Sequence, residues 1–90
     1  MILLNIHAAP PKDDVETGGA FICCWIDDPD PDSAELLARR TIREQGWTPV
    51  TVDEIRIVGR EDYVDSDSLD HYEQAALDGA CFVFHTYPPE

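Results

Sequence analysis

The stretch Ala20–Ile26 carries an apolar side chain at each of its seven positions. Successive side chains of a β-strand point to opposite faces of the sheet, so a strand of this kind needs cover on both faces. We therefore predict that Ala20–Ile26 is an interior strand of a sheet. The other elements are expected to pack against it or to form an acidic surface.

The segment that precedes this stretch divides into a strand and a loop. Ile2, Leu4 and Ile6 recur with a period of two, which predicts a β-strand at the start of the chain. Residues 8–19 then combine prolines and glycines with charged side chains, a composition typical of turns and exposed loops. We expect an exposed loop over 8–19.

A helix is predicted over residues 33–45. Asp32 is its expected N-cap, Glu35 stands three positions later as in a capping box, and Gly46 supplies the residue that ends the helix. The expected buried face follows helical spacing: Ala34, Leu37, Ala38, Thr41 and Ile42.

The segment 47–58 is predicted to be extended. Its apolar alternation shifts by one residue between Val52 and Ile55, which indicates a β-bulge or a turn near Asp53 and Glu54, and we favour the bulge. Residues 61–64 are expected to form a short edge strand protected by its charges.

A second helix and a last strand complete the chain. Gly79 is expected to end the helix, and the apolar residues of 80–86 predict the strand. The buried face of this helix is expected to contain four positions: Leu69, Tyr72, Glu73 or Ala76, and Leu77.

From residue 20 onward the predicted order is β-α-β-β-α-β. This order resembles the ferredoxin-like plait, and the expected fold is therefore a two-layer α+β fold in which an antiparallel sheet carries both helices on one face. Here an extra N-terminal strand precedes the plait. At 90 residues, the chain is expected to be a single α+β domain over 1–90.

A plait leaves one sheet face open, yet the central stretch is apolar on both faces. We expect this open face to be buried by a second copy of the chain or by the N-terminal segment folding back. The candidate dimer-face residues lie on two strands: Phe21, Cys23, Trp25 and Val83.

The net charge of −13, with 19 Asp and Glu against 6 Lys and Arg, constrains the partners. Such a surface repels phosphate backbones and anionic lipids, so neither direct nucleic-acid binding nor membrane binding is expected. It suits a basic protein partner, or adaptation to high salt, and composition does not separate the two. Three of the cations, Arg39, Arg40 and Arg43, fall within the first predicted helix.

The expected location is the cytoplasm. No apolar run approaches the roughly 20 residues that span a bilayer, and the first residues lack the pattern of a signal peptide. Cys23, Cys24 and Cys81 are odd in number and lie within apolar strand patterns, which indicates reduced, buried thiols.

The candidate chemistry is sparse. Cysteines that bind zinc usually stand as a spaced pair on a turn, whereas the adjacent Cys23 and Cys24 point to opposite faces, so no metal or cofactor is expected. The Asp clusters at 28–32 and 65–70 have the spacing that opens a calcium loop, but neither continues it, and helix capping explains them. No catalytic residue is assigned.

Two classes of function follow. The first is a small, non-catalytic, homodimeric interaction or regulatory module. The alternative is a small ligand-binding protein or enzyme that uses a cavity of a dimeric α/β barrel. The wider set of aromatic and histidine candidates for such a cavity also includes Trp47, Tyr63 and His71. The main ligand-pocket candidates are Trp25, Cys24, Tyr72 and His85.

Overall fold

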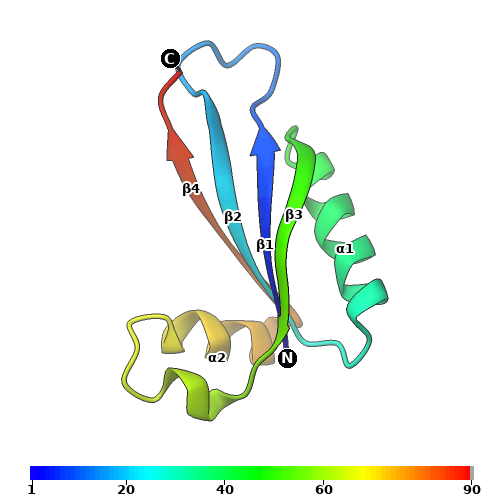
Figure 1. The fold of residues 1–90 in the computed structure, drawn as a ribbon, viewed down its shortest axis with the longest axis vertical. Coiled ribbons are helices and arrows are strands. Elements are labelled where there is room, and N and C mark those ends of the chain that lie inside the picture. Colours follow the sequence, from blue (N-terminus) through cyan, green and yellow to red (C-terminus); the bar gives the residue numbers. More distant parts are fainter. Residues whose placement is uncertain (90) are drawn as a thin grey trace.

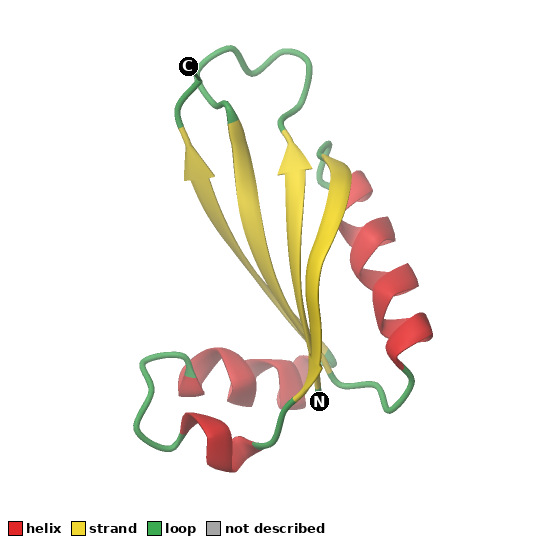
Figure 2. Cartoon of the chain, viewed as in Figure 1, coloured by secondary structure: helices red, strands yellow, loops and turns green. Residues whose placement is uncertain are grey.

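A computed structural model of the protein describes residues 1–89 and places four antiparallel strands in one sheet (Figure 1, Figure 2). The strand order is β3-β1-β2-β4. The elements in chain order are β1 (Ile2–Ala9), β2 (Gly19–Ile26), α1 (Pro31–Glu44), β3 (Thr48–Ile57), the 3₁₀ helix η1 (Arg60–Tyr63), α2 (Leu69–Asp78) and β4 (Ala80–Tyr87).

The predicted α+β class, with an antiparallel sheet and two helices, is confirmed. The apolar stretch Ala20–Ile26 forms β2, an interior strand as expected, between β1 and β4. The N-terminal strand is the second interior strand, because β1 pairs with β2 on one side and with β3 on the other. The loop expected over 8–19 is shorter, since Ala9 ends β1 and Gly19 begins β2.

Helix α1 forms on the predicted face but begins earlier. Its N-cap is Asp30, whose side chain accepts hydrogen bonds from the Asp32 backbone N–H at 3.1 Å and from the Ser33 hydroxyl at 3.0 Å. Pro31 fits the first helical position because its missing N–H would have no partner there. The predicted capping box of Asp32 and Glu35 is therefore wrong, and Glu35 pairs with Arg39 instead.

The bulge predicted in the third extended segment is confirmed. The pairing of β1 with β3 passes from Glu54 to Val52 and leaves Asp53 without a partner, and a second shift skips Val50. The predicted edge strand at 61–64 is wrong, because η1 occupies this position. Its Asp62 carboxylate accepts the Gly59 backbone N–H at 2.8 Å, which stabilises a tight turn rather than an extended segment.

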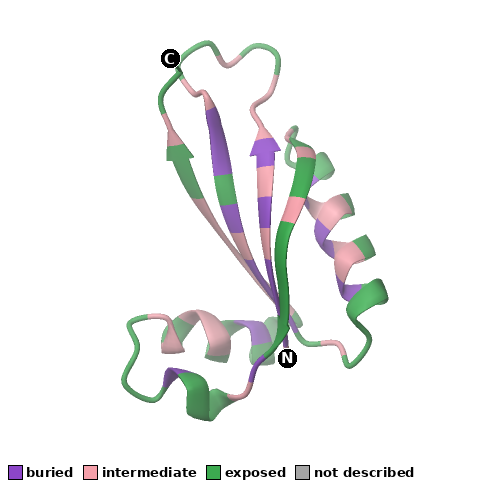
Figure 3. Ribbon diagram, in the orientation of Figure 1, coloured by how far each residue is buried: buried purple, intermediate pink, exposed green. Residues whose placement is uncertain are grey.

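The two helices pack on opposite faces of the sheet, rather than on the one face expected (Figure 1). The face that carries Leu4 and Ile22 packs against Ala34, Ala38 and Ile42 of α1. The opposite face carries Leu3 and Trp25, which pack with η1 and α2. Figure 3 shows that burial is concentrated in β1, β2 and the inner side of α1.

Helix α2 covers only one end of its sheet face, and its buried side differs from the prediction. Ala75 is fully buried and Tyr72 is partly buried, whereas Leu77 is 82% exposed and Ala76 is also exposed. Gly79 ends the helix with a positive φ of 91°, as predicted. Beyond α2 the same face remains uncovered toward the other end of the sheet.

Candidate functional site

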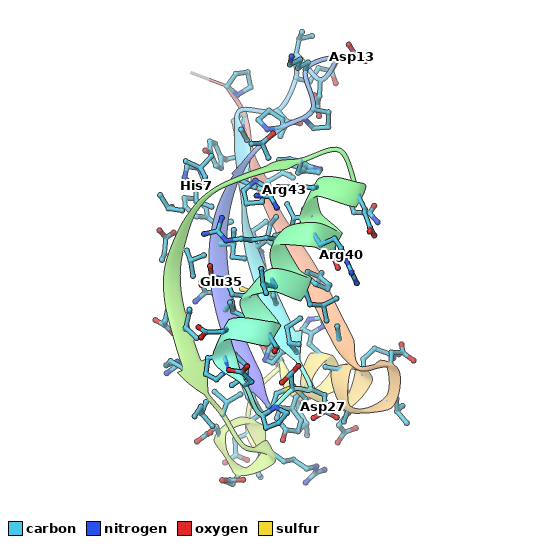
Figure 4. The ribbon with its side chains drawn as sticks, turned by 90° about the vertical axis from the view of Figure 1, so that its right-hand side faces the viewer. His7, Asp13, Asp27, Glu35, Arg40 and Arg43 are labelled. Carbon is cyan, nitrogen blue, oxygen red and sulfur yellow. The ribbon has the colours of Figure 1, made fainter. Side chains whose placement is uncertain are left out.

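Three of the four strands contain no Asp, Glu, Lys or Arg, although 28% of the chain is charged. These strands, β1, β2 and β4, have eight residues each. The charges lie on the loops, on β3 and on the helices, where Figure 4 shows Glu35, Arg40 and Arg43 on α1. The centre of the sheet is thus an uncharged surface within a strongly acidic protein.

The uncovered end of this sheet face holds a cluster of aromatic and histidine side chains. The register aligns His7, Phe21 and His85 in one row across β1, β2 and β4. The rings of His7 and Phe21 stack with centroids 4.8 Å apart, and the Tyr87 ring lies 5.4 Å from Phe21. His7 Nε2 and the Tyr87 hydroxyl are hydrogen-bonded at 2.5 Å. We call His7, Phe21, His85 and Tyr87 the open cluster.

Phe21 is the most informative member of the open cluster because it is 51% exposed. Exposure of a large aromatic ring is unfavourable in water, since burial contributes roughly 25 cal/mol for each Å² of apolar surface. Cys23 and Val83 continue the surface toward α2 and are partly buried. All four candidate dimer-face residues lie on this side of the sheet, and three of them, Phe21, Cys23 and Val83, keep part of their surface exposed.

The fourth candidate, Trp25, lies at the covered end and is only 4% exposed. Its Nε1 donates a hydrogen bond to the Tyr63 hydroxyl at 3.1 Å. The His71 ring stacks on the indole with centroids 5.3 Å apart, and the rings of Tyr63 and Tyr72 are 5.6 Å apart. The structure thus gathers four of the predicted pocket residues into one packed cluster where η1 and α2 meet the sheet.

The other pocket candidates lie elsewhere. Cys24 is fully buried on the α1 face, and Trp47 packs near Phe84 on that same face with ring centroids 5.6 Å apart. His85 is exposed at the open end of the opposite face. The structure therefore brings Trp25 and Tyr72 into one cluster but does not bring Cys24 or His85 to it.

The three cysteines are unpaired, and each thiol is in an environment that favours its protonated form. Burial raises the pKa of Cys24 to about 12. Burial, with the negative charge of Glu54, raises the pKa of Cys23, and burial with Asp78 raises that of Cys81. A thiol is a nucleophile or metal ligand as its thiolate, so these shifts oppose both kinds of chemistry.

Within residues 1–89, no group of three or more His, Cys, Asp or Glu side chains is arranged to hold a metal ion. The first Asp cluster caps backbone groups instead: Asp28 accepts the Asp30 backbone N–H at 2.8 Å, and Asp30 caps α1. A hollow on the protein surface lies along α1, lined by Ser33, Leu36, Leu37, Arg40 and Arg43.

Sequence reasoning did not bring His7 and Tyr87 together, although they complete the open cluster. His7 lies next to the alternating residues of β1, and a histidine in that pattern gives no signal of its own. Tyr87 directly precedes Pro88 and reads as the end of a strand. Only the strand order, which places β1 beside β2 and β2 beside β4, brings the two rings together.

The fold and its surface define an α+β protein with a half-covered sheet, three of whose four strands are uncharged, inside an acidic periphery. Among the helices within residues 1–89, none has the length and apolar character needed to cross a membrane. Comparison with models of known protein families, with curated proteins and with solved structures gives no match.

Proposed function

We propose that this protein is a small, non-catalytic interaction module that works as a homodimer in the cytoplasm. The observation that carries this proposal is the contrast between the uncharged strands β1, β2 and β4 and the acidic remainder of the chain. Copies with a net charge of −13 repel one another, so an uncharged surface favours a contact between them.

The open cluster supports a role in protein interactions for a second reason. Phe21 is half exposed beside His7 and Tyr87, and aromatic residues are enriched at protein interfaces. The three unpaired thiols fit the reducing conditions of the cytoplasm. The geometry offers no comparable support to the alternative function, because its four pocket candidates do not converge on one cavity.

The acidic periphery is then free to bind a second protein, and we propose a basic one. Opposite charge speeds association and fixes orientation more than it adds affinity. The four ion pairs found in the described part of the chain involve four of its 19 acidic residues, which leaves many carboxylates for a cationic partner.

Light scattering over about a hundredfold range of protein concentration tests the homodimer, because mass action favours dimers at high concentration. We expect the mass of a dimer at the upper end. A monomer throughout the range would refute the homodimer.

Binding to polylysine, followed at low and high salt, tests the acidic surface. We expect an affinity that falls steeply as salt rises, because salt screens exposed charges. Binding that does not change with salt would refute an electrostatic docking surface. Polyglutamate of the same length is the matched control and should not bind.

A further inference from the structure

The two edges of the sheet differ in their protection against strand pairing. Edge strands expose unpaired N–H and C=O groups, and natural proteins protect them with prolines, charges and bulges. The edge strand β3 has all three kinds of protection: Pro49, the charged residues Asp53, Glu54 and Arg56, and two shifts in its pairing with β1.

The other edge strand, β4, has none of these features along its length. Its sequence from Ala80 to Tyr87 contains no proline and no charged residue, and it pairs with β2 without a register shift. Prolines follow only after its last residue, at 88 and 89. In a chain with 28% charged residues, an edge strand of eight uncharged residues is an open template for another strand.

The outward backbone groups of β4 can be assigned from the ladder. The Asp27 backbone N–H donates to the Gly79 carbonyl at 2.9 Å, at the end where β2 meets β4. Hydrogen-bonded and non-bonded pairs alternate along antiparallel strands. The N–H and C=O groups of Phe82, Phe84 and Thr86 therefore point away from β2, toward the free edge.

The side chains of β4 are also incompletely covered. The backbone of helix α1 lies over β3, β1 and β2 rather than β4, and α2 packs against β4 on the opposite face. Phe82 and Phe84, on the α1 face of the strand, are only partly buried. On the opposite face, His85 is exposed and Val83 is partly buried. A strand added at this edge would cover apolar surface on both faces.

We propose that the two copies of the protein join through β4, pairing antiparallel about a twofold axis to form one continuous eight-stranded sheet. This inference rests on the proposed homodimer, because it states how the copies are joined. A second copy is the occupant favoured by charge: β4 pairs with its own image, so no like charges meet although each copy carries −13.

The position of α2 favours this edge over stacking of the two sheet faces. Helix α2 and η1 stand on the same face as the open cluster, at the other end of the sheet (Figure 1). They would hold a second sheet away from much of that face. Helix α2 also contacts β4 on this face, but pairing at the edge uses the outward backbone groups of β4 rather than the face itself. It brings the Phe82 and Phe84 side chains of both copies together on the α1 side of the sheet.

Amide hydrogen exchange at concentrations below and above the dimerisation midpoint tests the edge directly. Dimer formation should slow exchange of the outward amides of Phe82 and Phe84 by about tenfold or more, because pairing protects them from water. The amide of Ile55, which points away from β1 at the opposite edge, should not change. A dimer in which the Phe82 and Phe84 amides exchange as fast as in the monomer would overturn the inference.

Two variants separate the edge contact from a stacked one. Thr86→Pro removes an outward N–H and leaves the ladder with β2 intact, and the matched control Thr86→Ala keeps that N–H. Phe21→Glu places a charge in the open cluster and so tests a contact between stacked sheet faces. We expect Thr86→Pro to raise the dissociation constant of the dimer by about tenfold or more, while Thr86→Ala and Phe21→Glu remain dimeric.

The remaining outcomes distinguish this inference from the proposed function. A dimer that Phe21→Glu dissolves and Thr86→Pro leaves unchanged would overturn the edge contact and preserve the proposed homodimer. A wild-type protein that is monomeric at every concentration would refute the homodimer itself.

Discussion

Cys24 is fully buried, and its Sγ donates a weak hydrogen bond to the Ile22 carbonyl at 3.7 Å. Burial raises its pKa from an ordinary value of 9.0 to about 12 because a thiolate would lose its hydration in the core. The folded protein therefore holds the thiol proton more tightly than the unfolded chain. This stabilisation is complete below pH 9.0 and is lost as the pH rises toward 12.

The measurable consequence is a loss of stability in alkali that depends on Cys24. Urea unfolding at about pH 8 and about pH 11 should show the wild type losing about 2 to 3 kcal/mol more than Cys24→Ala. Cys24→Ala leaves a cavity whose cost is the same at both pH values. The change in the free energy of unfolding between the two pH values therefore reports the thiol's contribution. Equal losses in the two proteins would contradict a raised pKa at this position.

Trp25 and Tyr63 form the buried hydrogen bond that fixes η1 on the sheet, at 3.1 Å. Tyr63→Phe keeps the ring but leaves the indole N–H without its partner, and an unsatisfied buried donor costs about 1 to 3 kcal/mol. Chemical denaturation should show this loss in the free energy of unfolding. In the Trp25→Phe background, which has no donor, the same change should cost much less, and an equal cost would exclude the hydrogen bond as its cause.

At the scale of elements, the start of α1 offers a sharp comparison between two aspartates. Asp30 accepts hydrogen bonds from the Asp32 backbone and from Ser33, so Asp30→Ala should destabilise the protein by about 1 kcal/mol. Asp32→Ala removes only a favourable charge in the first turn and should cost less. Thermal unfolding of both variants checks the order, and a larger loss for Asp32→Ala would restore the cap predicted from the sequence.

The spacing of apolar side chains within single segments was enough to predict several elements. The apolar run of β2, the buried stripe of α1 and the bulge at Asp53 all follow from side-chain spacing. The segment 61–64 was mispredicted although the outer edge of β3 is free, because residue spacing does not show that Asp62 caps the Gly59 N–H and favours a turn. The turn lets the Tyr63 hydroxyl reach Trp25.

The candidate site was predicted only in part, for a related reason. Phe21, Cys23 and Val83 were expected on one face from their alternation, and the structure places them there. Burial of Trp25 depends on α2 crossing that face, and the approach of His7 to Tyr87 depends on strand order. Both are long-range arrangements, and residue spacing within one segment does not encode them.

At the scale of the whole molecule, charge and apolar surface are separated in space. The sheet strands β1, β2 and β4 are uncharged, although the chain has 19 acidic residues against six basic ones. This separation lets one protein carry two contacts of opposite character. An uncharged contact between copies should persist in salt, whereas an acidic contact with a basic partner should weaken.

The same acidity leads to a prediction about stability in salt. Repulsion among the excess carboxylates opposes folding, and salt screens it, so the melting temperature should rise as salt is added. The screening length is about 8 Å at 0.15 M and about 3 Å at 1 M, so most of the gain should be complete well below 1 M.

The dependence of the melting temperature on salt concentration separates the two explanations of the acidity, a basic protein partner and adaptation to high salt. A surface meant for a basic partner needs only screening, so we expect the melting temperature to level off below about 1 M sodium chloride. A rise that continues to several molar would instead indicate a surface adapted to high salt, and would contradict the basic partner as the reason for the acidity. Sodium sulfate at matched ionic strength is the control: it strengthens apolar burial as well as screening, so any additional gain in sulfate measures the core and not the charges.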